Sequence, residues 1–226
     1  MIVNKKKPSI LIVAAHPDDE ILGCAGSVAK LIKDGYEVFS LILGEGITSR
    51  DAKDKNDLNK LHEHARKASK SLGIKKLFIH SLPDNKFDTV PLLDIVKFVE
   101  KVKKEVKPVI IFTHYVNDLN IDHQITYKAV LTATRPITEE TVKEIYSFEV
   151  LSSTEWNYPL SFSPDVFFDI TETIDLKLKA MKEYKTELKS APHPRSLAGI
   201  KLSAKIWGMK VGMKYAEAFK SVRILK

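Results

Sequence analysis

Apolar runs and helical patterns alternate along this chain from residue 10 to residue 151. The apolar runs predict buried strands, and the amphipathic stretches between them predict helices. The expected strands are 10–15, 37–43, 76–82, 108–113 and 144–151, and the expected helices are 20–34, 57–72, 91–106 and 123–134. Alternation of this kind is typical of right-handed βαβ units, so it predicts an α/β fold with a doubly wound, mostly parallel sheet.

The alternation changes after Ser152. One more strand is expected at 166–170, followed by helices at about 174–188 and about 197–219. The chain shows no internal repeat, low-complexity tract or obvious flexible linker. We therefore expect residues 1–226 to form one domain, a mostly parallel sheet with an extra C-terminal strand and helices.

Two loops carry an unusual density of ionisable side chains. The segment HPDDE, residues 16–20, follows the first strand, and HYVNDLNIDH, residues 114–123, follows the fourth. A doubly wound sheet binds ligands beyond the carboxyl ends of its strands, where the strand order reverses. In the common order 3-2-1-4-5 the first and fourth strands are neighbours at that point, so we expect the two loops to face each other.

Within these loops, His16, Asp19 and His123 have the side chains of a catalytic zinc site. Three protein ligands leave one coordination position open for water, and the ion would lower the pKa of that water toward ~7. Asp18 is then placed to accept the proton of the water as general base. These residues also have structural explanations. Acids in the first turn of a helix are favoured by its dipole whatever the function, and a histidine at the end of a strand is more often a surface or hydrogen-bonded residue than a ligand.

Composition narrows the class of protein. The net charge is +7, from 36 Lys and Arg against 29 Asp and Glu, and a positive charge favours anionic partners. Nucleic acid is not expected among them, because the sequence shows no recognition helix and no aromatic, basic platform. Only Cys24 is available as a thiol, so no internal disulfide is possible and a cytoplasmic location is expected. No segment approaches the ~20 apolar residues that span a bilayer.

Several motifs together resemble one family. AHPDDE near the N-terminus and NDLNIDH downstream are similar to motifs of the PIG-L/LmbE-like zinc-dependent N-deacetylases. The resemblance extends through LPDNKFD, PHPRS and YAEAF and so covers nearly the whole chain. It implies a Rossmann-like fold and removal of acetate from an N-acetylated amino sugar. By matching position, it gives His16, Asp19 and His123 the metal roles and Asp18 the role of base.

One position departs from the family pattern. Many relatives have a histidine three residues before the second-loop ligand, and this chain has Asn120 there. An amide can stabilise an oxyanion, but it does not change protonation state. His193, in PHPRS, is therefore our candidate for a second proton-transfer residue, and a turn between two prolines explains it equally well.

Other residues have weaker assignments. Arg50 and Asp84 are candidates for binding substrate, and Asn85 stands beside Asp84 at the same sheet edge. Asp122 is expected to support the metal ligands. Arg195 is expected to pair with a carboxylate such as Glu217 rather than to bind an anionic substrate.

The expected function is therefore a zinc-dependent deacetylase, with Fe²⁺ or another divalent ion as a possible metal. The expected substrate is a small acetylated amino sugar or its conjugate, with no nucleic acid partner, and the chain is a candidate homo-oligomer. A phosphoesterase with two metals and a non-catalytic binder of an anionic or nucleotide ligand are the alternatives. The sugar and its carrier, whether free, lipid-linked or nucleotide-linked, are left open.

Overall fold

The computed structural model describes residues 7–47 and 55–226. Its centre is a seven-stranded sheet in the order β3-β2-β1-β4-β5-β7-β6. The strands are β1 (Ser9–Ala14), β2 (Glu37–Gly44), β3 (Lys76–Leu82), β4 (Ile110–His114), β5 (Glu144–Phe148), β6 (Val166–Asp169) and β7 (Ala216–Ile224). The first five pair in parallel, which confirms the doubly wound α/β fold.

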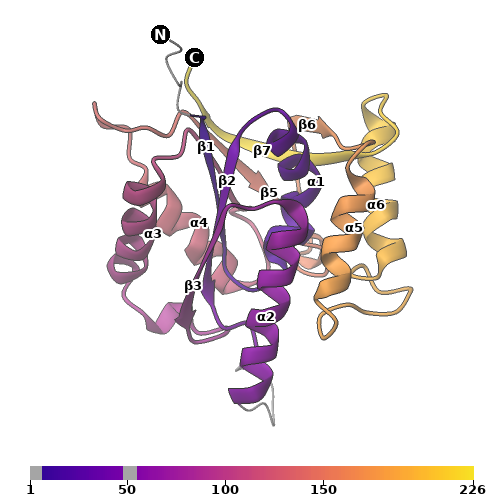
Figure 1. Cartoon of the computed structure of the whole chain (residues 1–226), viewed down its shortest axis with the longest axis horizontal. Coiled ribbons are helices and arrows are strands. Elements are labelled where there is room, and N and C mark those ends of the chain that lie inside the picture. Colours follow the sequence, from indigo (N-terminus) through magenta and orange to yellow (C-terminus); the bar gives the residue numbers. More distant parts are fainter. Residues whose placement is uncertain (1–6, 48–54) are drawn as a thin grey trace.

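Helices cover both faces of this sheet (Figure 1). One layer contains α3 (Leu92–Val106) and α4 (Ile121–Ala133), and the other contains α1 (Asp19–Lys33), α2 (Lys55–Leu72), α5 (Ile174–Glu183) and α6 (Leu197–Lys210). Short 3-10 helices, η1 (Phe87–Thr89) and η2 (Thr154–Trp156), lie in loops. The helix that we predicted to end near Leu188 is α5, and it ends at Glu183.

Residues of β1 alternate between the two layers, as the pleat of a strand requires. Ile10 and Ile12 pack into the hydrophobic cluster beneath α1 and α2, whereas Leu11 and Val13 pack into the cluster beneath α3. Cys24 lies in the first of these clusters and is fully buried. A continuous apolar run is therefore the sequence of a strand that is covered on both sides.

Strands β1 and β4 are direct neighbours, with Ile10 opposite Ile110 and Ile12 opposite Phe112. The order of the first five strands is the one expected from the sequence. Because β1 and β4 are parallel, the loops that follow them leave the same edge of the sheet.

The predicted last helix is wrong at its C-terminal end. Helix α6 stops at Lys210, and Ala216–Ile224 forms β7, antiparallel to both β5 and β6. Gly212 has φ +75, a conformation that favours glycine and ends a helix. The residues that follow pair with β5 on one side and with β6 on the other, so the backbone groups of β7 are hydrogen-bonded within the sheet.

No helix among residues 7–47 and 55–226 is long and apolar enough to cross a membrane.

Candidate metal and catalytic site

The two polar loops meet beyond the carboxyl ends of β1 and β4. His16, Asp19 and His123 each offer one ligand atom, and these three atoms lie within 4.8 Å of one another. All three residues are buried, with side-chain exposures of 10%, 4% and 3%. The structure therefore brings together the three residues that the sequence suggested as metal ligands.

Each ring nitrogen of His16 faces a carboxylate. Nδ1 lies 3.4 Å from Oδ2 of Asp19, and Nε2 lies 2.9 Å from Oδ2 of Asp122. Burial alone would lower the pKa of His16, but hydrogen bonds to Asp122 and Asp19 outweigh it and raise the pKa to about 10. Asp122 thus orients the His16 ring through Nε2, while Nδ1 faces Asp19, which also contacts His123.

Asp122 is itself held in place by the backbone. Its Oδ2 accepts the N–H of Asn85 at 2.7 Å, and its Oδ1 accepts the N–H of Phe87 at 2.9 Å. Asp84 adds a further carboxylate, with Oδ1 3.3 Å from Nε2 of His16. The loop after β3 therefore supports the His16 ring, and Asp84 lies against this ligand group.

His123 repeats the arrangement from the first turn of α4. Its Nε2 lies 3.3 Å from Oδ2 of Asp19, and its Nδ1 lies 3.1 Å from Oδ1 of Asp118, close enough for an ion pair although not aligned as a hydrogen bond. Burial lowers the pKa of His123, but Asp19 and Asp118 outweigh this effect and raise the pKa to about 9. Histidines that ligate metals commonly have such a carboxylate behind the ring.

Asp118 was missed by the sequence analysis. Its carboxylate accepts hydrogen bonds of 2.5 Å from the hydroxyls of Ser153 and Thr154, which come from the loop after β5. Burial raises its pKa, but His123 and these hydroxyls lower it to about 2. Its place in NDLNIDH, five residues before His123, was the available clue.

His114, the last residue of β4, packs behind this group. Its ring stacks on that of His123 with centroids 4.0 Å apart, and its Nε2 accepts the N–H of Ala15 at 2.8 Å. Burial lowers the pKa of His114 well below its usual value, so the ring is neutral. A neutral, fully buried ring that is fixed to β1 gives His123 a rigid wall.

Asp18 is buried, lines the small polar pocket at this site and has an unusual backbone conformation. Its φ of 102 lies in the left-handed region, which non-glycine residues adopt at a cost of roughly 1–3 kcal/mol. Its backbone N–H donates to Oε2 of Glu20 at 3.1 Å, and Glu20 accepts the hydroxyl of Tyr184 at 2.5 Å. Burial raises the pKa of Asp18 and Arg195 lowers it, with a net rise to about 7.

Arg195 reaches Asp18 from the segment before α6. Its Nη1 lies 3.0 Å from Oδ2 of Asp18 and 3.8 Å from Oε2 of Glu187, and its Nε donates to the Ser152 hydroxyl at 2.7 Å. The expected pairing with Glu217 is wrong, because Glu217 instead pairs with Lys177 at 2.6 Å. The arginine belongs to the site.

The donor set fits a divalent cation. Five aspartates, each at most 3% exposed as a whole residue, have carboxylates around His16 and His123: Asp18, Asp19, Asp84, Asp118 and Asp122. Buried carboxylates are costly unless they are paired or bind a metal. The carboxylates raise the pKa values of His16 and His123, so they favour protonated, positively charged rings. A bound metal ion would supply this positive charge in place of the protons. Two imidazoles and one carboxylate are ligands that suit zinc, and iron(II) binds the same set.

A small polar pocket lies at this site, and some of the remaining predicted residues line it. Asn120, Asp84 and Asn85 line it, together with Asp18, Glu187 and Arg195. Asn120 also caps α4, because its Oδ1 accepts the N–H of Asp122 at 2.8 Å while its Nδ2 donates to Oδ1 of Asn85 at 2.9 Å.

One candidate among the described residues is not brought to the pocket. His193 does not line it, and Nδ1 of its ring accepts the backbone N–H of Arg195 at 3.1 Å. Arg50 lies outside the described residues. Gly46 lines the pocket next to Pro17. A larger residue would not fit there, because a Cβ at this position would lie 2.7 Å from Cδ of Pro17.

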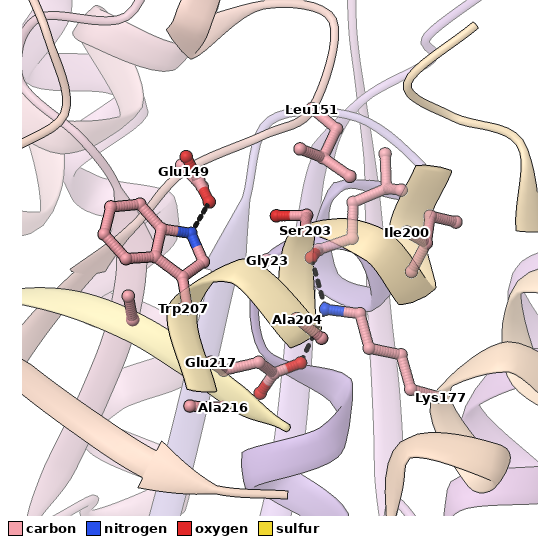
Figure 2. A pocket seen from close by; sticks show the side chains of 12 residues that line it. Gly23, Glu149, Leu151, Lys177, Ile200, Ser203, Ala204, Trp207, Ala216 and Glu217 are labelled. Atoms are coloured by element: carbon pink, nitrogen blue, oxygen red, sulfur yellow. Dashed lines mark hydrogen bonds and ion pairs between the residues drawn. The ribbon is translucent and has the colours of Figure 1, made fainter. Parts of the chain in front are cut away.

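A second pocket lies between α1, α5, α6 and β7 (Figure 2). Trp207 Nε1 donates to Oε1 of Glu149 at 2.5 Å, and Lys177 Nζ donates to the Leu22 carbonyl at 2.7 Å and lies 2.6 Å from Glu217. Burial raises the pKa of Glu149 to about 7. Among the described residues, none lines both this pocket and the polar pocket at the metal site.

Solved structures of known proteins share this fold. N,N'-diacetylchitobiose deacetylase from Pyrococcus horikoshii aligns with a TM-score of 0.78 at 19% identity, over 97% of this chain and 85% of that one. The 4-carboxy-2-hydroxymuconate hydratase from Pseudomonas putida aligns with a TM-score of 0.75 at 20% identity, over 97% and 98%. A fold shared by a deacetylase and a hydratase does not by itself decide the reaction.

Sequence relationships are more specific. The profile of PIG-L, described as GlcNAc-PI de-N-acetylase, matches residues 11–134, which include both polar loops. YaiS of Escherichia coli K12, named an uncharacterized deacetylase, is 30% identical over 189 residues, which are 81% of this chain and 93% of that protein. This chain therefore belongs to the PIG-L family of deacetylases.

Proposed function

We propose that this protein is a zinc-dependent hydrolase that removes acetate from an N-acetylated amino sugar or a conjugate of one. The observation that carries the proposal is the convergence of His16, Asp19 and His123 beside a pocket that contains Asp18. The substrate class agrees with the description of the PIG-L profile and with the acetylated sugar named for the Pyrococcus enzyme.

His16, Asp19 and His123 would hold the ion. When bound, zinc supplies a Lewis acid that acidifies water and polarises a carbonyl group. Asp118 and Asp122 orient the two imidazoles, each through the ring nitrogen that faces away from Asp19. Iron(II) is the alternative metal for the same ligands.

Asp18 acts as general base and removes a proton from the attacking water. A carboxyl group with a pKa near neutrality is suited to this task, because it both accepts and returns a proton at neutral pH. Arg195 fixes the orientation of the carboxylate. Because His193 does not line the pocket, we assign to Asp18 the return of the proton to the leaving amine as well.

Asn120 is placed to donate from Nδ2 to the acetyl oxygen as negative charge develops on it. An amide nitrogen has two hydrogens, so one remains for the substrate while the other is donated to Asn85. Asp84 and Asn85, on the same wall, are proposed to contact sugar hydroxyls, and Arg50 stays a prediction.

A phosphoesterase with two metals is the second candidate, because His16, Asp84 and Asp122 form another group with metal-ligand spacing. Against it, both oxygens of Asp122 already accept backbone N–H groups, and Nε2 of His16 faces this carboxylate at 2.9 Å. These contacts favour a single ion. That residues 1–226 form one domain, and that the protein is cytoplasmic, stay predictions.

The test is acetate release from free, nucleotide-linked and lipid-linked N-acetylglucosamine. Protein stripped by a chelator is reloaded with zinc or iron(II), and bound metal is counted per chain. We expect one ion per chain and acetate release that returns only with metal, whereas His123→Ala should bind no ion. Two ions per chain, with hydrolysis of phosphate esters and no acetate, would support the phosphoesterase instead.

A further inference from the structure

Helix α6 is apolar on two opposite faces. Its inner face is buried through Ile200 and Ala204. Its outer face presents Leu202, Ile206 and Met209, which are 57%, 46% and 71% exposed. Residues spaced i, i+4 and i+7 form one stripe along a helix, where a surface helix normally has polar side chains. The helix lies at the outer edge of the molecule, beyond α5 (Figure 1). The stripe is exposed and lies opposite the buried face of the helix.

Lysines flank the stripe. Lys201 and Lys205 lie along one side of the stripe and Lys210 lies along the other side, and all three are exposed. Lys210 Nζ lies 4.0 Å from the centre of the Trp207 ring, which anchors its stem on the helix. The segment from Leu197 to Lys214 contains no Asp or Glu. The outer face is therefore both apolar and positively charged.

This combination discriminates between partners. A second copy of the chain would place like charges together in a two-fold contact, because such a contact pairs the same patch on both subunits. A bilayer with anionic headgroups satisfies both features at once: the apolar stripe enters the boundary between headgroups and acyl chains, and the lysines reach the phosphates. We propose that the outer face of α6 docks the protein on an anionic membrane surface.

The proposal does not rest on the proposed deacetylation, and binding is measured without substrate. Purified protein is sedimented with vesicles of phosphatidylcholine alone or mixed with phosphatidylglycerol. We expect binding to the mixed vesicles only, weakened by salt. Ile206→Glu with Met209→Glu should lower it at least ~10-fold, since two lost apolar contacts and two added negative charges both oppose docking. Lys205→Gln with Lys210→Gln should weaken binding and reduce its salt dependence.

A matched control adds the same charge elsewhere. Leu93 and Ile137, 60% and 69% exposed, lie outside the α6 face, so Leu93→Glu with Ile137→Glu should bind vesicles like the unchanged protein. Equal loss in this control, or no binding of the unchanged protein to anionic vesicles, would overturn the proposal. So would a dimer, seen by light scattering, that separates when Ile206 and Met209 are replaced, because the face would then belong to a second copy.

Discussion

Nη1 of Arg195 lies 3.0 Å from Oδ2 of Asp18, although the two residues are 177 positions apart in the sequence. The contact joins the loop after β1 to the segment before α6. It gives the proposed base a fixed orientation and a pKa lower than burial alone would produce. The Ser152 hydroxyl, which accepts from Nε of Arg195, fixes the guanidinium in turn.

Arg195→Ala should reduce turnover by about tenfold or more while the metal content stays near one ion per chain, because a base that is not oriented loses much of its advantage. Arg195→Lys should restore part of the rate, since it keeps the charge and loses the second contact. Turnover and metal analysis of the three proteins check this prediction. Loss of metal in the alanine variant would instead make Arg195 a structural support of the ligand loop.

Asp18→Asn should retain metal and lose on the order of 10²–10⁴ in turnover, the usual share of general base catalysis. Asparagine suits this test because it tolerates the left-handed backbone that Asp18 adopts at φ 102. Acetate release and metal content are measured together, with melting temperature as the control for folding. Near-normal turnover in a folded, metal-loaded variant would mean that another group acts as base.

Asn120 has two roles that one pair of variants separates. Asn120→Ser keeps an N-cap acceptor for α4 but cannot extend an amide donor into the pocket, whereas Asn120→Ala loses both. If Asn120 donates to the developing oxyanion, both variants should lose ~10²–10³ in turnover. Only the alanine variant should also melt at a lower temperature. A serine variant with normal turnover would leave Asn120 as a cap alone.

Asp118→Asn should weaken zinc binding by about 10–100-fold, the usual effect of removing a carboxylate behind a metal-binding histidine. Turnover should partly return at high zinc, because His123 itself remains. Competition with a chelator of known affinity measures the change. Asp165→Asn removes an exposed carboxylate that pairs with Lys220, and it should leave zinc affinity unchanged.

We expect the free energy of unfolding to depend on pH through the buried side chain of Glu149. Burial raises its pKa from 4.5 to about 7, so the folded protein resists its ionisation. Below pH ~4.5 Glu149 is protonated in both the folded and the unfolded protein, so its burial does not change the free energy of unfolding. As the pH rises the unfolded protein loses this proton first, so the free energy of unfolding falls, and the loss is complete above pH ~7. Glu149→Gln still accepts from Trp207, so it should stabilise the protein by up to roughly 3 kcal/mol at pH ~8 and by almost nothing at pH ~4.5. Denaturant unfolding of both proteins across this range measures it; equal differences at all pH values would contradict it.

The sequence by itself determined strands β1 to β6 and the two polar loops that follow β1 and β4. The order of the first five strands followed from the common arrangement of doubly wound sheets. The strands and loops follow from local patterns: a continuous apolar run predicts a strand covered on both faces, and parallel βαβ units place the following loops at one edge. HPDDE and NDLNIDH could therefore be brought together without coordinates.

Tertiary structure alone decided which side chains complete the site. Asp118 faces His123 because hydroxyls from the loop after β5 fix its carboxylate, and no local pattern records that contact. Arg195 reaches Asp18 rather than Glu217, because Glu217 is already engaged by Lys177 and by the backbone N–H groups of α1. In the same way, Ala216–Ile224 became a strand because β5 and β6 offered it two ladders of hydrogen bonds. Such long-range pairings outweigh local propensity, which is why the sequence could not foresee them.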